Sequence, residues 1–288
     1  ADGSARVVTG SNPYGQGHVT AWSMLVSDQT GIPLDRIDVV YGDTDLVPTG
    51  ETTGGSRSLQ IAGSAVFDAT EKLVEMARQR ASELLEANPA DIVLDTETAR
   101  FHVAGTPAVS IGWEEIGATS IADGNQLFAL SDFTASGPTF PFGTHIAVVE
   151  IDSETGKVEL RRIIACDDAG VILNPLLVDG QVHGGLAQGI SQALFEEVRY
   201  DEVGNPLSTT LLDYLMPSAA EFPPFERVEM ETPSPINPLG AKGIGESGTI
   251  GSTPAVQNAV VDAVSHLGIR HIDMPLTPER VWRAINGL

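Results

Sequence analysis

Cysteine is nearly missing from this sequence, which contains Cys166 and no other. A disulfide within the chain is therefore excluded, and so is a metal or Fe–S site built from several cysteines. Cys166 follows the apolar run "RRIIA", which indicates a buried thiol of the core rather than a nucleophile. The sequence also lacks a signal peptide, a lipidation motif and any apolar run of the roughly 20 residues that span a bilayer. We expect no membrane partner, and we expect the protein to be cytoplasmic.

Positive charge is scarce as well, with 16 Lys and Arg against 39 Asp and Glu and a formal net charge of −23. A chain this acidic is unsuited to nucleic acid or to an anionic membrane surface. Solubility is the simplest explanation of the charge. A phosphate-bearing cofactor stays compatible with it, because backbone N–H groups at helix ends bind phosphate without a basic patch.

Along the chain, segments whose apolar residues have helical spacing alternate with segments whose apolar residues have the spacing of strands. Apolar residues at helical spacing predict helices in five places: within "GQGHVTAWSMLVSDQTG", which Gly31 would end, residues 61–87, residues 178–197, a helix with Pro254 near its first position, and a final helix capped by Thr277. Period-2 alternation with turn residues predicts strands in "RIDVVYGD", "DIVLDTETARFHVAG", "HIAVVEIDSETGKVELRRIIACDDAG", "RYDEVGNPLSTTLLDYLMP" and "RVEMETPS". The segment "AVSIGWEEIG" predicts a strand followed by a short helical turn.

The loop-like stretch 131–144 separates two halves of similar content. "YGQGHVTAWSML" in the first half has a short echo in "DGQVHGGLAQGI" of the second. The sequence therefore predicts an α+β fold of two related units, residues 1–140 and 141–288.

Four segments combine glycines with polar residues directly before an expected helix: Gly15–His18, Gly54–Ser58, Gly180–Gly185 and Gly243–Gly248. Glycine lets a ligand approach the backbone closely, and a helix N-terminus offers unpaired N–H donors with partial positive charge. Together they favour a binding site for a polar, anionic ligand, although each alone is also compatible with a tight turn or close helix packing. None has the spacing of a P-loop or of a dinucleotide-binding GxGxxG turn.

Individual polar residues leave alternatives open. Glu246 is either a plain capping acid or a general base, and a base working near neutral pH needs burial to raise its pKa. Arg57 suits a phosphate or a neighbouring acid. His18 and His183 match no compact metal motif, so structural histidines are favoured over metal ligands. We therefore predict no metal ligand from the protein.

Six motifs together resemble one family over nearly the whole chain: "GQGH", "GDTD", "GGSRS", "DAGVILNP", "VDGQVHGGLAQGISQAL" and "GAKGIGESGTIG". They are similar to the molybdenum-binding large subunits of the xanthine dehydrogenase, aldehyde oxidase and carbon monoxide dehydrogenase family. The resemblance implies a molybdenum–molybdopterin cofactor, often the cytosine dinucleotide form in bacteria, held in a cleft between the two units. It also implies hydroxylation of a small substrate such as an aldehyde or N-heterocycle with oxygen from water.

The resemblance assigns roles to residues of this sequence. Glu246 matches the active-site glutamate, the base that activates the attacking hydroxyl. The positions expected to bind the cofactor are Gly15, Gln16, Gly17, His18, Gly55, Ser56, Arg57, Ser58, Gln188, Lys242, Gly243 and Gly245.

The family's large subunits are much longer than 288 residues, and this chain resembles their C-terminal part. The expected partners are therefore the N-terminal half of the molybdenum subunit, an Fe–S subunit and an FAD subunit. Ala169 stands where many relatives have cysteine, and Cys166 is not at the position of the copper-binding cysteine of carbon monoxide enzymes. A different class of protein also fits the glycine-rich segments, namely a non-catalytic scaffold that binds an anion at helix ends and does not need Glu246.

Overall fold

The computed structural model describes residues 1–47 and 49–288. They form two compact units, the first made of Ala1–Thr139 with Pro233–Lys242 and the second of Phe140–Thr232 with Gly243–Leu288. Both units mix helices with strands, which confirms the predicted α+β class. In the described part of the chain, every helix is too short or too polar to cross a membrane.

The strands of the first unit pair in three small groups. Strand β1 (Ala5–Thr9) runs parallel to β3 (Ile37–Tyr41), and the short β2 (Ser11–Asn12) runs parallel to β4 (Glu51–Thr52). The third group is antiparallel, in the order β5 (Ile92–Asp95), β6 (Arg100–Val103) and β7 (Thr106–Gly112). The predicted hairpin in "DIVLDTETARFHVAG" is thus confirmed as β5 and β6.

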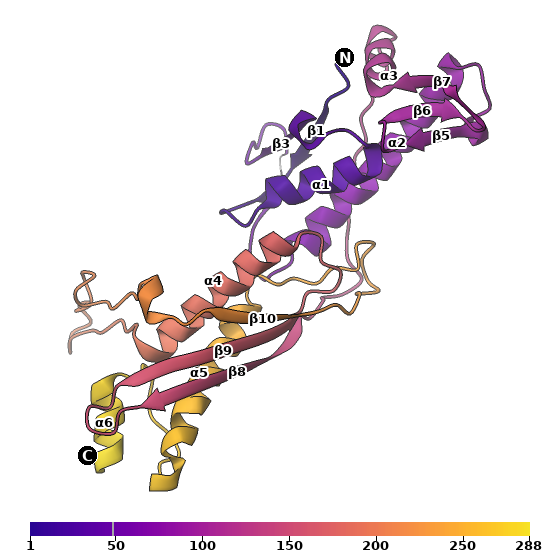
Figure 1. Ribbon diagram of the computed structural model, residues 1–288. Coiled ribbons are helices and arrows are strands. Elements are labelled where there is room, and N and C mark those ends of the chain that lie inside the picture. Colours follow the sequence, from indigo (N-terminus) through magenta and orange to yellow (C-terminus); the bar gives the residue numbers. More distant parts are fainter. Residues whose placement is uncertain (48) are drawn as a thin grey trace. The chain divides into compact units, whose positions relative to one another are not determined.

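Helices α1 (His18–Thr30) and α2 (Ser64–Leu84) cross in the first unit, as Figure 1 shows in indigo and purple. A π-helical turn, Leu59–Gly63, leads into α2, so the helix predicted at 61–87 begins earlier and ends at Leu84. Short 3₁₀ turns lie at Leu34–Arg36 and Pro89–Asp91. Helix α3 (Trp113–Ala122) follows β7, and the Trp113 ring meets Phe101 edge-on at 5.0 Å to close the core.

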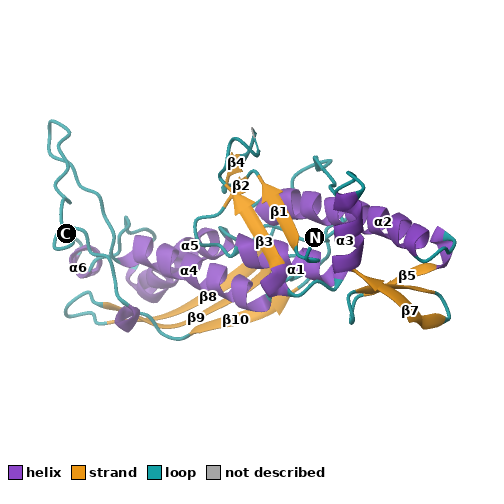
Figure 2. Cartoon of the chain, turned by 90° about the horizontal axis from the view of Figure 1, so that it is seen from above, coloured by secondary structure: helices purple, strands orange, loops and turns teal. Residues whose placement is uncertain are grey.

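The second unit is built on a sheet with the order β10–β9–β8. Strands β8 (Phe142–Ile151) and β9 (Val158–Asp168) form the predicted antiparallel hairpin, and β10 (Phe225–Met230) pairs parallel with β9. Figure 2 shows helices α4 (Pro175–Leu194) and α5 (Ser247–Val264) lying side by side over one face of this sheet. Short 3₁₀ turns occupy Ala219–Glu221 and Ser265–Leu267, and α6 (Pro278–Asn286) ends the chain with Thr277 as N-cap, as predicted.

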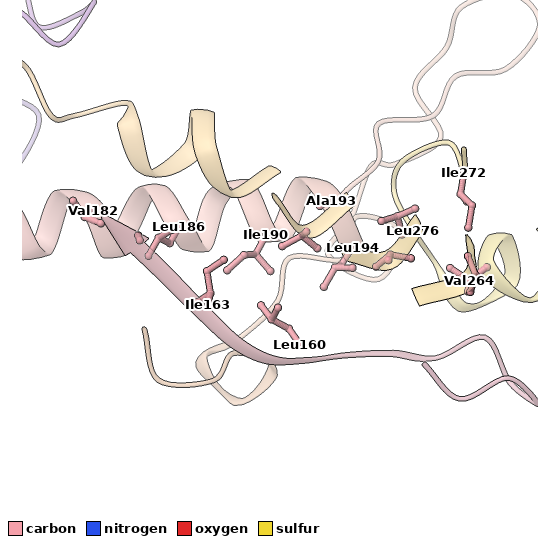
Figure 3. Close-up of a cluster of buried hydrophobic side chains, with 14 residues drawn as sticks. Leu160, Ile163, Val182, Leu186, Ile190, Ala193, Leu194, Val264, Ile272 and Leu276 are labelled. Atoms are coloured by element: carbon pink, nitrogen blue, oxygen red, sulfur yellow. The ribbon is translucent and has the colours of Figure 1, made fainter. Parts of the chain in front are cut away.

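The core of the second unit lies between the sheet and the two long helices (Figure 3). Val182, Leu186 and Ile190 recur at helical spacing along α4, and none of them is exposed. With Ala193 and Leu194 of the same helix, they pack against residues of β9, α5 and the C-terminal segment, namely Leu160, Ile163, Ala165, Val256, Val260, Val264, Ile272, Leu276 and Val281.

Two sequence predictions in the second unit are wrong. "RYDEVGNPLSTTLLDYLMP" forms no strand, and an isolated bridge between Tyr200 and Pro206 is its only described β-pairing. Pro254 does not start a helix but lies inside α5, which begins at Ser247. Proline removes one helical N–H donor, whose acceptor would be the carbonyl of Ile250. Ile250 is 70% exposed, so water can replace the missing bond.

Two further expectations change in detail. The helix predicted at 178–197 begins at Pro175, because the Asn174 side chain accepts a hydrogen bond from the Leu177 N–H, 3.1 Å away, and caps it. Cys166 is a free thiol but is only partly buried, since its place on β9 leaves it outside the closely packed core.

Candidate functional site

The first glycine-rich segment forms the turn into α1. Gly15 and Gly17 have φ of 99° and 83°, a region that favours glycine, and Gly17 is the N-cap of the helix. The side-chain carbonyl of Gln16 accepts a hydrogen bond from the Tyr14 backbone N–H. A methyl group added at Gly15 would meet no atom of the described residues within 4 Å, so this face of the turn is open.

The second segment turns the chain into α2. Gly55 has φ of 69°, and Ser56 has φ of 50°, which is unusual for a residue with a side chain. Strained backbone of this kind is concentrated at functional sites. The π-helical turn that follows is also a feature frequent at such sites. Gly54 and Gly55 face open space, as Gly15 does.

The fold brings these two segments together. The strands that precede them, β2 and β4, pair with each other, and the Thr53 hydroxyl donates to the Asn12 carbonyl at 2.6 Å. The hydroxyls of Tyr14 and Thr52 also share a hydrogen bond. Gly15–His18 and Gly55–Ser58, far apart in the sequence, therefore belong to one region of the first unit.

His18 is the buried residue of this region, with 7% of its surface exposed. Its ring lies 5.1 Å from that of Trp22, and its Nδ1 has no hydrogen-bond partner among the described residues. Burial lowers the pKa of His18 and outweighs the opposing hydrogen bond to the Ser11 backbone. The packing of the His18 ring against Trp22 is consistent with a structural residue. Its Nδ1 can still accept a hydrogen bond.

In the second unit, Glu246 occupies the N-cap position of α5 and is exposed. Its side chain makes no capping hydrogen bond to the helix, so the interpretation as a plain capping acid is not supported. Its backbone carbonyl accepts from the Ile250 N–H at 3.1 Å, the first bond of the helix. Glu246 is thus fixed by its main chain, and the carboxylate lies beside the positive end of the α5 dipole.

Helices α4 and α5 touch backbone to backbone behind Glu246. A methyl group added at Gly248 would lie 2.6 Å from the Val182 carbonyl oxygen, and one at Gly185 would lie 2.9 Å from the Gly248 Cα. Gly180–Gly185 lies inside α4, so the prediction that this segment precedes a helix is wrong. At Gly185 the absent side chain serves close helix packing, the alternative weighed for these segments.

Gln188 projects from α4 toward the first turn of α5. Its side-chain Oε1 lies 3.3 Å from the hydroxyl oxygen of Thr249, one turn after Glu246. The structure thereby links the "LAQGI" and "GESGTIG" motifs through Thr249, a residue that the sequence reasoning missed. No periodicity pairs two residues so far apart in the chain, although Thr249 does stand within the recognised motif.

The remaining predicted positions are placed as follows. Lys242 is buried and belongs to the first unit, together with Arg57 and the two turns described above. Gly243 and Gly245 belong to the second unit with Glu246 and Gln188, and Gly243 is buried whereas Gly245 is exposed.

Comparison with known proteins gives one consistent result. A family model described as the molybdopterin cofactor-binding domain matches residues 1–223. The carbon monoxide dehydrogenase large chain of Hydrogenophaga pseudoflava is 40% identical over 288 residues, which are 98% of this chain and 36% of that protein. The nicotine 6-hydroxylase large subunit of Paenarthrobacter nicotinovorans is 38% identical over 293 residues, 99% of this chain and 36% of that protein.

Solved structures agree. Quinoline 2-oxidoreductase from Pseudomonas putida 86 matches with a TM-score of 0.88 and 37% identity, over 98% of this chain and 36% of that one. This chain thus spans little more than a third of the length of the relatives that it matches.

Proposed function

The chain belongs to the molybdopterin cofactor-binding domain family, and from this we propose that it is the cofactor-binding, catalytic portion of a molybdenum hydroxylase. The observation that carries the proposal is the placement of Glu246. An exposed carboxylate stands at the N-cap position of α5 without capping the helix, and the main-chain carbonyl of the same residue accepts the first hydrogen bond of the helix from Ile250.

The residues present fit such a cofactor. Open glycine faces at Gly15, Gly54 and Gly55 give an anionic ligand close access to backbone N–H groups. The buried His18 Nδ1 has no hydrogen-bond partner among the residues that the structure describes, so in a neutral ring it can accept a hydrogen bond from the ligand. We propose that the cofactor is held by Gly15, Gln16, Gly17, His18, Gly55, Ser56, Arg57, Ser58, Gln188, Lys242, Gly243 and Gly245.

Each part of the chain then has a chemical task. When bound, the molybdopterin supplies the redox chemistry and takes up the electron pair of substrate oxidation. Glu246 accepts, at its carboxylate, the proton of the water-derived hydroxyl that is transferred to the substrate. Gln188 and the backbone donors of the first unit hold and orient the cofactor, so that it meets preorganised dipoles.

The rest of the assembly is proposed from the relatives. Matched proteins are named as a large chain and a large subunit, and one as the gamma subunit of a dehydrogenase complex. We propose that this chain works with the remaining part of a molybdenum subunit and with Fe–S and FAD subunits that carry electrons away. Its substrate would be a small aldehyde, an N-heterocycle or a similar molecule, and the cytoplasm stays the predicted compartment.

A single experiment separates this function from that of a non-catalytic anion-binding scaffold. The native complex is purified, its molybdenum and pterin are quantified, and turnover is screened on aldehydes, N-heterocycles and carbon monoxide. Glu246→Gln should keep the cofactor and lose turnover by about 10² to 10⁴-fold, the usual contribution of a general base. Glu279→Gln is the matched control, because Glu279 is an acid in the first turn of α6 and so also lies at the start of a helix.

The control should leave turnover unchanged. A Glu246→Gln complex with normal turnover would show that Glu246 is not the base. A wild-type complex without molybdenum or pterin would refute the proposed function itself and favour the scaffold.

A further inference from the structure

Thr249 contacts two acceptors on α4 at once. Its hydroxyl oxygen Oγ1 lies 3.0 Å from the backbone carbonyl oxygen of Gly185 and 3.3 Å from Oε1 of Gln188. Leu186 and Ile190 point from α4 into the core (Figure 3), whereas Gln188 between them is exposed. The contact with Thr249 is thus a side-chain anchor for a residue that the core does not hold.

One proton cannot serve both acceptors. A threonine hydroxyl donates a single hydrogen bond and can accept others. The Gly185 carbonyl is the nearer oxygen and is fixed by the helix, so it receives the proton. The Gln188 amide can rotate by half a turn and exchange its oxygen and nitrogen, which heavy-atom positions do not distinguish. With Nε2 turned toward Thr249, both short contacts become hydrogen bonds, whereas with Oε1 there only one forms.

The same arrangement recurs one turn along the helix pair. The hydroxyl oxygen of Thr253 lies 3.2 Å from the Gly189 carbonyl oxygen and 3.2 Å from Oε1 of Gln192. The carbonyl of Thr249 is also 3.2 Å away, so the Thr253 proton has a backbone acceptor as well. The repeat supports the reading that these hydroxyls donate to backbone and accept from glutamine amides.

We propose that Thr249 is a positioning residue that holds Nε2 of Gln188 and so directs its carbonyl oxygen, Oε1, toward the cofactor. Gln188 then acts as an acceptor, and the cofactor group that it meets is an N–H or O–H donor, as a pterin ring offers. This inference rests on the proposed function, because it requires Gln188 to face the cofactor. It adds the direction of the hydrogen bond and the residue that sets it.

The test uses the purified complex with Thr249→Val, Thr249→Ser and Thr253→Val as the matched control. Two quantities are measured, namely the molybdenum and pterin retained after prolonged dialysis and the separate values of kcat and KM. Thr249→Val should speed cofactor loss and lower kcat by roughly fivefold or more, as expected when a hydrogen bond that orients a binding group is removed. Thr249→Ser keeps the hydroxyl and should restore both, and Thr253→Val should stay within about twofold of wild type.

Other outcomes overturn the proposal. If both valine variants match wild type, Thr249 does not position Gln188. If both lose cofactor equally and melt at a lower temperature, the hydroxyls serve only helix packing. If Thr249→Ser behaves as Thr249→Val does, the methyl group matters and the hydroxyl does not. Absence of molybdenum and pterin from the wild-type complex would instead refute the proposed function, and this inference with it.

Discussion

The contact between α4 and α5 makes a quantitative prediction about two neighbouring glycines. A methyl group at Gly185 would lie 2.9 Å from both the Gly248 Cα and the Thr249 backbone nitrogen. These are main-chain atoms, so a helix must move. Overpacking of this kind costs typically 1–3 kcal/mol. A methyl group at Gly184, in the same helix, would meet no atom within 4 Å.

Both glycines gain about 1 kcal/mol of helix propensity when replaced by alanine, so this gain cancels in a comparison. Gly184→Ala should stabilise the second unit by up to about 1 kcal/mol. Gly185→Ala should be less stable than Gly184→Ala by roughly 1–3 kcal/mol, the overpacking cost alone.

Hydrogen exchange read by mass spectrometry measures this difference directly. Amides of α4 and α5 report the second unit, and those of β5–β7 in the first unit serve as an internal reference. Faster exchange in α4 and α5 of Gly185→Ala, with slower exchange in Gly184→Ala, is the expected result. Equal protection in both variants would refute the backbone contact between the helices.

Two predictions concern the first unit. The unfolded His18 takes up a proton near pH 6.5 and the folded one only at lower pH, so the free energy of unfolding should fall as the pH drops below 6.5. Urea titrations at several pH values should show a smaller fall in His18→Gln, and an unchanged fall would contradict the lowered pKa. Trp113 Nε1 donates to the Thr30 carbonyl at 2.9 Å, so Trp113→Phe should cost about 1–3 kcal/mol in urea titrations followed by circular dichroism. Trp282→Phe, at a site 38% exposed, should cost less, and equal losses would count against the buried bond.

Local signals predicted much of the fold. The turn "DSETGK" fixed the expectation of the β8–β9 hairpin, and Thr277 with Pro278 identified the start of α6, because both signals depend on residues close in sequence. Local rules failed where packing overrides them. Pro254 has the signature of a first helical position, but the buried Gly248 and Ser252 before it extend α5 back to Ser247.

The sequence predicts a set of site residues but not how they are arranged. The motifs that resemble the family pointed to Glu246 and Gln188, whereas the contact of Gln188 with Thr249 depends on helix packing that no local pattern encodes. The strand expected after α4 failed for a similar reason. Its apolar residues Leu211 and Leu212 are 69% and 90% exposed, so in this chain they have no sheet face to cover.

Glycine has two different tasks in the segment around Glu246. Gly245 is exposed beside the carboxylate, where a small residue leaves room for a ligand. Gly248 is buried, and a methyl group added there would lie 2.6 Å from the Val182 carbonyl oxygen. Any side chain at this position would therefore push α5 away from α4. The packing at Gly248 also determines where Glu246 lies. The backbone contact at Gly248 sets the position of the first turn of α5, and the hydrogen bond from the Ile250 N–H to the Glu246 carbonyl connects Glu246 to that turn. The main chain of Glu246 is therefore held in place by this helix contact, and the base that we propose needs such a fixed position to meet a bound substrate in one geometry.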